Sequence, residues 1–473
     1  MSGVTDDRAM TSETAPEPAA AGPGPTATPA YRRSLRREIL RLAWPAILEY
    51  SLHTMVWLVD VAFVGRISAE ALSATGLGGQ VYFFALFLFG AVSTAATAMI
   101  ARRIGAGQPA EGARIAGQLG VIGLGLGLVV TALIWLISPL VFAATQLGPE
   151  VSALGVSYQR ILSLGAPMFI LRSVLVGAMH GFGDTRSPMV IAAIAGLFNI
   201  FADWALIQGR LGLPPLGVAG AATASALAHV LGAVILLFIL AKRLTPARVD
   251  FRRALQFQWP VLRTTIRLGL PAAGEHLLTD SARTIGVFII AYIGVTAVAA
   301  HEVTVAVESL SFMPGWGFAI ATSIIVGQSL GRGDPARARA AVREAALIAV
   351  AFGLTMSALM LLFPGPLVGL FTTDATVRAT ATRLLRIAGL VQPLIAIQGV
   401  CGGALRGAGD TRSPMIAGGV SSWLVRLSIT YVAVILLGLP VDWVWWAMLG
   451  DWLVRATWLW VVYRRGRWQE VQV

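Results

Sequence analysis

The sequence contains little charge and almost no cysteine. Only 13% of its 473 residues are charged while 56% are hydrophobic, whereas soluble domains carry about 25% charged residues. The mean hydropathy is +0.74. The single cysteine, Cys401, cannot form an intrachain disulfide, and no Cys/His cluster has the spacing of a metal site. The composition therefore predicts an integral membrane protein with no bound metal or organic cofactor.

Other absences exclude classes of function. Lys242, the only lysine, follows Ala241, so the Gly-Lys-Ser/Thr ending of a P-loop is missing and this chain is not expected to hydrolyse ATP. The H-E-x-x-H zinc signature is also missing, and no enzyme activity is expected. The net charge of +12 does not indicate nucleic-acid binding, because the arginines lie in short segments between apolar runs.

Apolar runs recur along the chain at a length that crosses a bilayer, which takes roughly 20 residues. They predict an all-α membrane protein with twelve transmembrane helices. The expected spans are 41–65, 77–101, 113–145, 154–180, 188–208, 215–241, 265–292, 297–326, 338–370, 379–405, 414–438 and 441–463.

Positive charge is concentrated in alternate loops. One set of segments carries the arginine clusters 32–37, 102–114, 242–253, 332–339, 406–412 and 464–467, whereas the opposite loops hold single arginines such as Arg66, Arg210 and Arg378. Because arginine-rich loops stay in the cytoplasm, we expect a multi-pass protein of the cell inner (plasma) membrane with both termini cytoplasmic.

The chain repeats itself at one constant offset. Arg41 and Pro45 recur as Arg267 and Pro271, and the heptapeptide GDTRSPM at 183–189 returns at 409–415, so each pair is separated by 226 residues. Separate motifs at one offset indicate duplication of a six-span unit. Six spans are an even number, so both copies enter the membrane in the same direction and form parallel repeats. In each heptapeptide, the serine is expected to cap the next helix, with proline in its first turn.

These observations divide the chain into five parts. Residues 1–35, rich in Ala, Pro and Thr, are expected to be a disordered cytoplasmic tail. The N-lobe covers 36–241 and the C-lobe 265–464, joined by a cytoplasmic linker at 242–264 and followed by a cytoplasmic tail at 465–473.

Ionisable side chains within spans are functional candidates, because they are costly in lipid. In span one, Glu49, His53 and Asp60 fall on one helical face, and in span five Asn199 and Asp203 share a face. Carboxylate and amide oxygens suit a proton or a sodium ion rather than a soft metal. The same pattern also fits buried polar groups that hydrogen-bond between helices for packing.

Several ordered motifs resemble the multidrug and toxic compound extrusion (MATE) family. They are RLAWPAILE and LVDVAFVGRIS within 41–68, NIFADW at 199–204, GVAGAATAS at 217–225, and the paired GDTRSP loops. The resemblance implies a twelve-helix, two-lobed antiporter. It carries over a cation or proton coupling site at Asp60, Asn199 and Asp203 with a hydroxyl from span six, Ser225 or the nearby Thr223.

The second half lacks this set, since Gly286 and Val425 occupy the positions that correspond to Asp60 and Asn199. Its intramembrane ionisable residues include Glu275, Asp280, Arg283, His301, Glu302, Glu308 and Arg426. Asp280 and Arg283 can pair on one face. Arg426 needs an anionic partner, which Glu275 or Glu308 could supply.

The secondary coupling candidates are Glu49, Glu275 and Glu308. Each of these carboxylates could instead have a structural role. Some relatives of the resembled family place coupling carboxylates in span seven, which keeps Glu275 among them. Two carboxylates in a poorly solvated cavity repel each other, so at least one of Asp60 and Asp203 is expected to hold a proton near neutral pH.

The resemblance implies export of small, organic, often cationic solutes in exchange for protons or sodium, with no cofactor beyond the coupling ion. The expected partners are these solutes and the lipid bilayer, with no nucleic acid and no obligate protein partner. The alternative is a lipid-linked oligosaccharide flippase of the same wider superfamily, for which a strongly cationic cavity and additional helices would be expected.

Reporter fusions test the predicted topology. Fusions after residues 108, 184, 253, 334 and 410 should report cytoplasm, and fusions after 212 or 440 should report the outside. An external signal after residue 253 would contradict the parallel-repeat arrangement.

Overall fold

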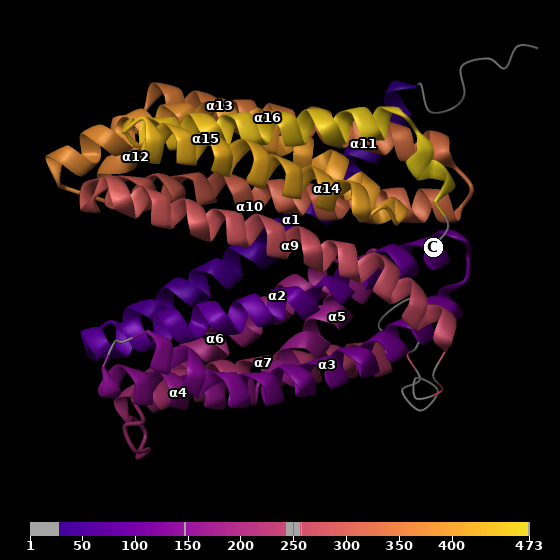
Figure 1. The fold of residues 1–473 in the computed structure, drawn as a ribbon. Coiled ribbons are helices and arrows are strands. Elements are labelled where there is room, and N and C mark those ends of the chain that lie inside the picture. Colours follow the sequence, from indigo (N-terminus) through magenta and orange to yellow (C-terminus); the bar gives the residue numbers. More distant parts are fainter. Residues whose placement is uncertain (1–27, 146–147, 243–248, 250–255, 257, 472–473) are drawn as a thin grey trace, which may run out of the picture.

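The computed structural model describes residues 28–145, 148–242, 249, 256 and 258–471, and these residues form helices without strands. The first half contains α1 (Pro29–Val64), α2 (Ala69–Gly105), α3 (Pro109–Ala144), α4 (Pro149–Ser163), α5 (Ala166–Phe182), α6 (Arg186–Gln208) and α7 (Val218–Ala241). The two halves lie beside each other as separate layers of long helices (Figure 1).

The second half repeats this order, with several of its helices divided into shorter segments. It contains α9 (Trp259–Ile293), α10 (Val295–Gly331), α11 (Pro335–Leu362), α12 (Pro364–Gly369), α13 (Ala375–Ala408), α14 (Arg412–Val420), the π-helical η2 (Ser421–Leu427), α15 (Ser428–Tyr431), the π-helical η3 (Val432–Leu436), α16 (Asp442–Arg464) and the 3₁₀-helix η4 (Arg467–Glu470).

The described helices confirm the all-α membrane fold. Eight segments are long and apolar enough to span a membrane, and α4 with α5, bent by 48°, forms a ninth. The long helices α2, α9 and α16 complete the twelve spans, with α11 and α12 counted as one crossing and the segment from α14 to η3 as another. Helix α4 begins at Pro149, before the predicted start of span four at 154.

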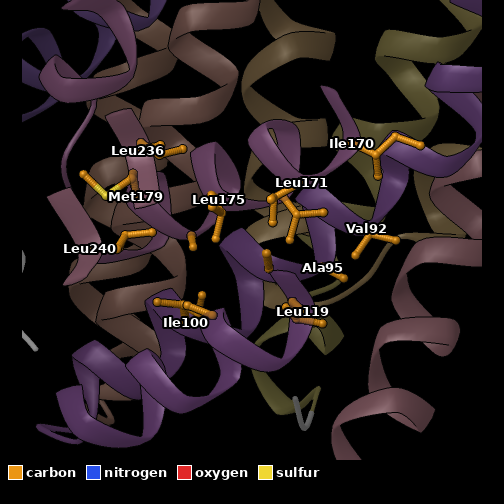
Figure 2. Packing of buried hydrophobic residues seen from close by; sticks show 14 of the residues in the cluster. Val92, Ala95, Ile100, Leu119, Ile170, Leu171, Leu175, Met179, Leu236 and Leu240 are labelled. Atoms are coloured by element: carbon orange, nitrogen blue, oxygen red, sulfur yellow. The ribbon is translucent and has the colours of Figure 1, made fainter. Parts of the chain in front are cut away.

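Small and branched side chains fill the interior of the N-lobe. Ala95 and Ile100 of α2 pack with Leu119 of α3, with Leu171, Leu175 and Met179 of α5, and with Leu236 of α7 (Figure 2). These residues are buried because they form the inward faces of four neighbouring helices, which is the pattern that sets the packing of a helical bundle.

Two helices cross between the lobes. The first half of α1 packs on the C-lobe, where Leu35 and Ile39 join the same core as Ile324 of α10 and Ala341 of α11. Its second half returns to the N-lobe, where Val56 lies against Gly196 of α6. Helix α9 does the converse: Thr265 contacts Met99 of α2, and its later turns pack on α14 and η2.

The crossing of α1 corrects one predicted boundary. The prediction of a disordered tail over 1–35 is wrong for residues 29–35, which are helical, while 1–27 lie outside the described residues. Thr28 caps the helix and Pro29 starts it. Arg36 pairs with Glu344, and Arg337 donates to both carboxylate oxygens of Glu38. These contacts to α11 could not be read from local composition.

The predicted linker over 242–264 is also too long. Helix α9 begins at Trp259 with Pro260 in its first turn, so residues 259–264 are helical. Residues 243–248, 250–255 and 257 lie outside the part of the chain that the structure describes.

The repeated GDTRSP loops are capped by aspartate rather than by serine. Asp184 Oδ1 accepts from the Ser187 backbone N–H at 3.0 Å, and its other oxygen accepts from the Ser187 hydroxyl at 2.6 Å. Asp410 and Ser413 make the same contacts at 3.0 and 2.6 Å. The aspartate accepts both donors because a carboxylate has two acceptor oxygens.

Two glycines join the lobes at the ends of α2 and α10. A Cβ on Gly105 would lie 2.0 Å from the Gln328 carbonyl oxygen, and a Cβ on Gly331 would lie 2.1 Å from the Arg102 carbonyl oxygen. Both contacts involve repeat-equivalent positions, since 105 and 102 plus 226 give 331 and 328. The two helices therefore meet backbone to backbone in a symmetric crossing.

The C-terminal segment after α16 contacts both lobes. Trp468 of η4 is 2% exposed and stacks on Tyr463, with its indole N–H donating to the Tyr463 carbonyl. Farther along, the Arg102 guanidinium of α2 donates to the Val471 carbonyl. The predicted tail at 465–473 thus contacts the crossing of α2 and α10 through Arg102.

Glycine substitution tests the crossing. Gly105→Ala is expected to lower the thermal unfolding temperature in detergent, because the added methyl must displace the Gln328 backbone and overpacking costs roughly 1–3 kcal/mol. The matched control is Gly125→Ala in α3, where nothing lies within 4 Å of the added Cβ. The control should be neutral or stabilising. Equal Tm values for Gly105→Ala and wild type would contradict the backbone crossing.

Candidate ion-coupling site

Three helices of the N-lobe bring the predicted site residues together. Asp60 lies on α1, Asn199 and Asp203 lie on α6, and Ser225 lies on α7. In the amide orientation that satisfies both neighbours, Asn199 donates to Asp60 Oδ1 at 2.8 Å and accepts from the Ser225 backbone N–H at 3.3 Å. In the opposite orientation its nitrogen lies 3.4 Å from the Ser225 hydroxyl.

The structure distinguishes the two hydroxyls that the sequence left open. The Thr223 hydroxyl donates to the Ala219 carbonyl one turn earlier at 2.7 Å. Ser225 is instead the neighbour of Asn199. The oxygen cluster on these three helices is therefore built from Asp60, Asn199, Asp203 and Ser225.

Asp203 is the most buried member of the cluster. Its side chain has 0% exposure, and neither carboxylate oxygen has a hydrogen-bond donor among the described residues. Asp60 is half-buried and lies close enough to Asp203 to interact directly with it. A buried carboxylate without a donor is stabilised by a proton or a bound cation. This arrangement can hold a proton between the two aspartates or coordinate a small hard cation.

Glu49 lies apart from this cluster although it shares the same helix. It is 6% exposed, and its Oε2 lies 3.4 Å from Nε2 of His180 on α5. Glu49 precedes Asp60 by eleven positions, which is about 16 Å along a helix. The structure therefore does not bring Glu49 into the Asp60 site.

Glu275 of α9 has a complete ion pair. Its two carboxylate oxygens accept from Arg406 Nη1 of α13 at 2.9 and 3.1 Å, with both side chains largely buried. Glu275 and Arg406 are the repeat equivalents of Glu49 and His180, since 49 and 180 plus 226 give 275 and 406. The C-lobe therefore places a permanent cation where the N-lobe has an imidazole.

Arg426 pairs with neither carboxylate that the sequence offered. Its Nε lies 3.5 Å from Asp451 of α16, a residue that is 1% exposed. Arg455 contacts the same carboxylate at 3.1 Å. Arg426 lies in the π-helical segment η2, a type of distortion that often accompanies function. Glu308 of α10 is buried and interacts with Arg426 only through space.

The other expected C-lobe pair forms: Arg283 Nη2 lies 3.4 Å from Asp280 on the same helix, with the arginine largely exposed. Sequence reasoning missed Asp451, Arg455 and Arg406. The repeat offset of 226 residues is the sequence signal that points to them. Positions 225, 229 and 180 of the N-lobe correspond to positions 451, 455 and 406 of the C-lobe. These C-lobe residues thus stand at the positions of Ser225, His229 and His180.

Residues 327–331 read Gly-Gln-Ser-Leu-Gly, a match to the nucleophile pattern of hydrolases. They lie inside α10, and the Ser329 hydroxyl donates to the Ile325 carbonyl at 2.6 Å and accepts from Arg337 at 3.1 Å. The pattern requires a strand-to-helix turn that exposes the serine. Ser329 is 0% exposed and is part of helix packing.

Two six-helix repeats that enclose buried carboxylates define a polytopic membrane transporter. The sequence profile of the MatE family matches residues 45–205 and 271–432, one match in each repeat. The chain belongs to the MatE family of membrane efflux transporters, as the sequence motifs predicted.

Two relatives extend over most of the chain. "Probable multidrug resistance protein NorM" of Thermotoga maritima is 32% identical over 437 residues, covering 92% of this chain and 94% of the relative. "Multidrug resistance protein MdtK" of Edwardsiella ictaluri is 27% identical over 400 residues, covering 84% and 87%.

Solved structures share the fold. A MOP superfamily transporter from Pyrococcus furiosus, described as having a binding pocket of reverse polarity, superposes with a TM-score of 0.85 at 23% identity, and the match covers 92% of this chain and 97% of that one. A MATE family transporter described as outward-facing gives 0.84 at 24% identity, covering 92% and 96%.

Breaking the Glu275–Arg406 pair tests its structural role. Glu275→Gln leaves Arg406 buried without its counter-charge, and breaking a buried pair costs roughly 3–5 kcal/mol. We expect a clear fall in Tm for purified protein. Glu49→Gln is the matched control, because its histidine partner can be neutral, and should lower Tm less. An equal fall for both variants would contradict the difference between the lobes.

Proposed function

We propose that this protein exports small organic, cationic solutes in antiport with protons or sodium, by alternating access of its two lobes. One observation carries the proposal: Asp203 is fully buried, lacks a donor among the described residues and lies against Asp60. The names of the NorM and MdtK relatives support a role in drug efflux.

The oxygen cluster gives a physical basis for exchange. Two adjacent carboxylates in a poorly hydrated site do not both remain charged without a cation. A proton, a sodium ion or a cationic solute can satisfy the same site, so binding of one disfavours binding of another. Exchange follows if protonation from outside releases the solute and deprotonation toward the cytoplasm resets the site.

The packing between the lobes supports alternating access. The contacts at Gly105 and Gly331 close one end of the interface, and α1 and α9 cross between the lobes as connecting helices. Opening requires the symmetric crossing to separate while α1 and α9 keep the lobes attached. Rocking of two repeats about a central site is one established arrangement in transporters.

The setting proposed for this activity is the inner (plasma) membrane, with both termini cytoplasmic. The solutes and the bilayer are the proposed partners, and neither nucleic acid nor an obligate protein partner is required. The coupling ion is the only cofactor proposed, and no enzyme activity is proposed.

A lipid-linked oligosaccharide flippase is not favoured. The Asp60–Asp203 locus is acidic, whereas anionic lipid headgroups require a cationic cavity. The curated relatives reported above are named as multidrug resistance proteins.

Conservative substitutions in reconstituted liposomes test the site. Wild type should move a cationic dye such as ethidium under an imposed proton gradient or sodium gradient. Whichever gradient drives transport identifies the coupling ion. Asp60→Asn and Asp203→Asn keep a polar group of similar shape but remove the titratable charge. Both variants should still insert into the membrane, but their rate of gradient-driven transport should fall at least about tenfold. A tenfold fall corresponds to about 1.4 kcal/mol at the coupling step.

Two variants serve as controls for this experiment. Asn199→Ala removes a neutral ligand and should weaken coupling less completely than either aspartate variant. Glu49→Gln lies outside the cluster and should have the mildest effect. Wild-type transport with unchanged ion dependence in both aspartate variants would refute the assignment and direct attention to Glu275 and Glu308.

A further inference from the structure

Helix α16 carries a groove on its exposed side. The helix packs on α13 and α14 and lies along the side of the C-lobe away from the N-lobe (Figure 1). The groove has a volume of about 570 Å³, and Leu453 and Trp458 in its wall are 53% and 39% exposed. Apolar side chains of α16 form most of the lining, which includes Val454 and Val462, and Arg465 closes one end.

The groove matches one leaflet of a bilayer in length. Leu453 and Arg465 are twelve residues apart, which is about 18 Å along a helix. One leaflet contributes about 15 Å to a hydrocarbon core of about 30 Å. A lipid acyl chain that begins at the Arg465 end therefore fits the groove, whereas a partner helix that spans the bilayer would extend well beyond it.

A polar pocket continues the groove at the arginine end. Arg465 lines both cavities, and the pocket, with a volume of about 460 Å³, is also bordered by Arg467, Glu470 and the turn between α10 and α11 at Gly333. Gly466 has a φ of +76°, a conformation that favours glycine. The chain turns at this glycine, so that Arg465 and Arg467 line the same pocket.

The pocket has an excess of positive charge. Arg465 and Arg467 are exposed, and neither forms an ion pair within the described part of the chain. Glu470 also lines the pocket, so two arginines and one glutamate leave a net charge of +1. The buried Trp468 ring stacks on Tyr463 and fixes η4, which forms this wall of the pocket. An apolar groove thus leads into a fixed cationic pocket.

We propose that one anionic phospholipid binds here, with an acyl chain in the α16 groove and its phosphate between Arg465 and Arg467. Guanidinium groups bind phosphate through charge-assisted hydrogen bonds, and basic pockets at the membrane surface recognise anionic headgroups. A second copy of the chain in the same orientation would bring its own arginines to the same membrane surface, where like charges repel. The inference concerns a lipid and is independent of the exported solute.

Native mass spectrometry tests the headgroup pocket. Purified full-length protein receives phosphatidylglycerol or phosphatidylcholine with the same acyl chains, and the dissociation constant of the first bound lipid is measured. Wild type should bind the anionic lipid at least about fivefold more tightly than the zwitterionic one. Arg465→Gln and Arg467→Gln should each weaken phosphatidylglycerol about fivefold, the effect of one arginine near an anionic headgroup, and change phosphatidylcholine much less.

Two further variants separate this pocket from general attraction to a charged membrane. Glu470→Gln removes the negative charge from the pocket and should tighten phosphatidylglycerol binding, which a loss of structure would not do. Arg464→Gln is the matched control, because the Arg464 guanidinium lies 4.7 Å from the Trp460 ring, and it should leave both lipids unchanged. Equal weakening by Arg464→Gln and Arg465→Gln would refute a defined headgroup pocket.

The groove is tested separately from the pocket. Thr457→Trp places a large side chain in the groove and should weaken both lipids, while the Tm in detergent stays near that of wild type because Thr457 is exposed. Unchanged lipid binding in this variant would overturn the acyl-chain assignment. A dimer in the same spectra that Thr457→Trp dissociates would also overturn it and assign the groove to a second copy of the chain.

Discussion

The need to pair each charge inside an apolar bundle governs the polar architecture of this protein. In the C-lobe the demand is met within the chain for two carboxylates: Glu275 binds Arg406, and Asp451 lies between Arg426 and Arg455, while Glu308 interacts with Arg426 only through space. In the N-lobe it is not met, since Asp203 has no donor in the described part of the chain. Unsatisfied buried charge is unfavourable unless a ligand supplies the partner. The N-lobe, where two carboxylates lie together and Asp203 has no donor in the described part of the chain, is therefore the one to which we assign ion and solute binding.

The fold could be predicted largely from the sequence because spanning length is a local property. Twelve apolar runs and a constant offset of 226 residues define two parallel repeats without knowledge of any contact. The start of α1 was missed, since Leu35 and Ile39 are ordered by packing on the distant helix α11. Its helical state depends on the C-lobe, which local composition does not report.

The residues that form the oxygen cluster could be predicted, because helical spacing places Asn199 and Asp203 on one face and the family motif adds Asp60. The pairing of the other charges was not predictable from spacing. Arg426 selects Asp451 because α16 packs on the π-helical segment that carries the arginine. Such choices depend on tertiary packing, and the repeat offset is the one sequence signal that points to the residues concerned.

The glycine contact between α2 and α10 has a consequence for the origin of the molecule. Gly105 meets Gln328 while Gly331 meets Arg102, so each half presents the same surface to the other. Such an isologous contact is the interface of a two-fold homodimer. Two unlinked copies of the six-helix unit could form it, and fusion into one polypeptide preserves the dimer geometry while freeing each copy to change alone. Asp60 in one half and Gly286 in the other record that divergence.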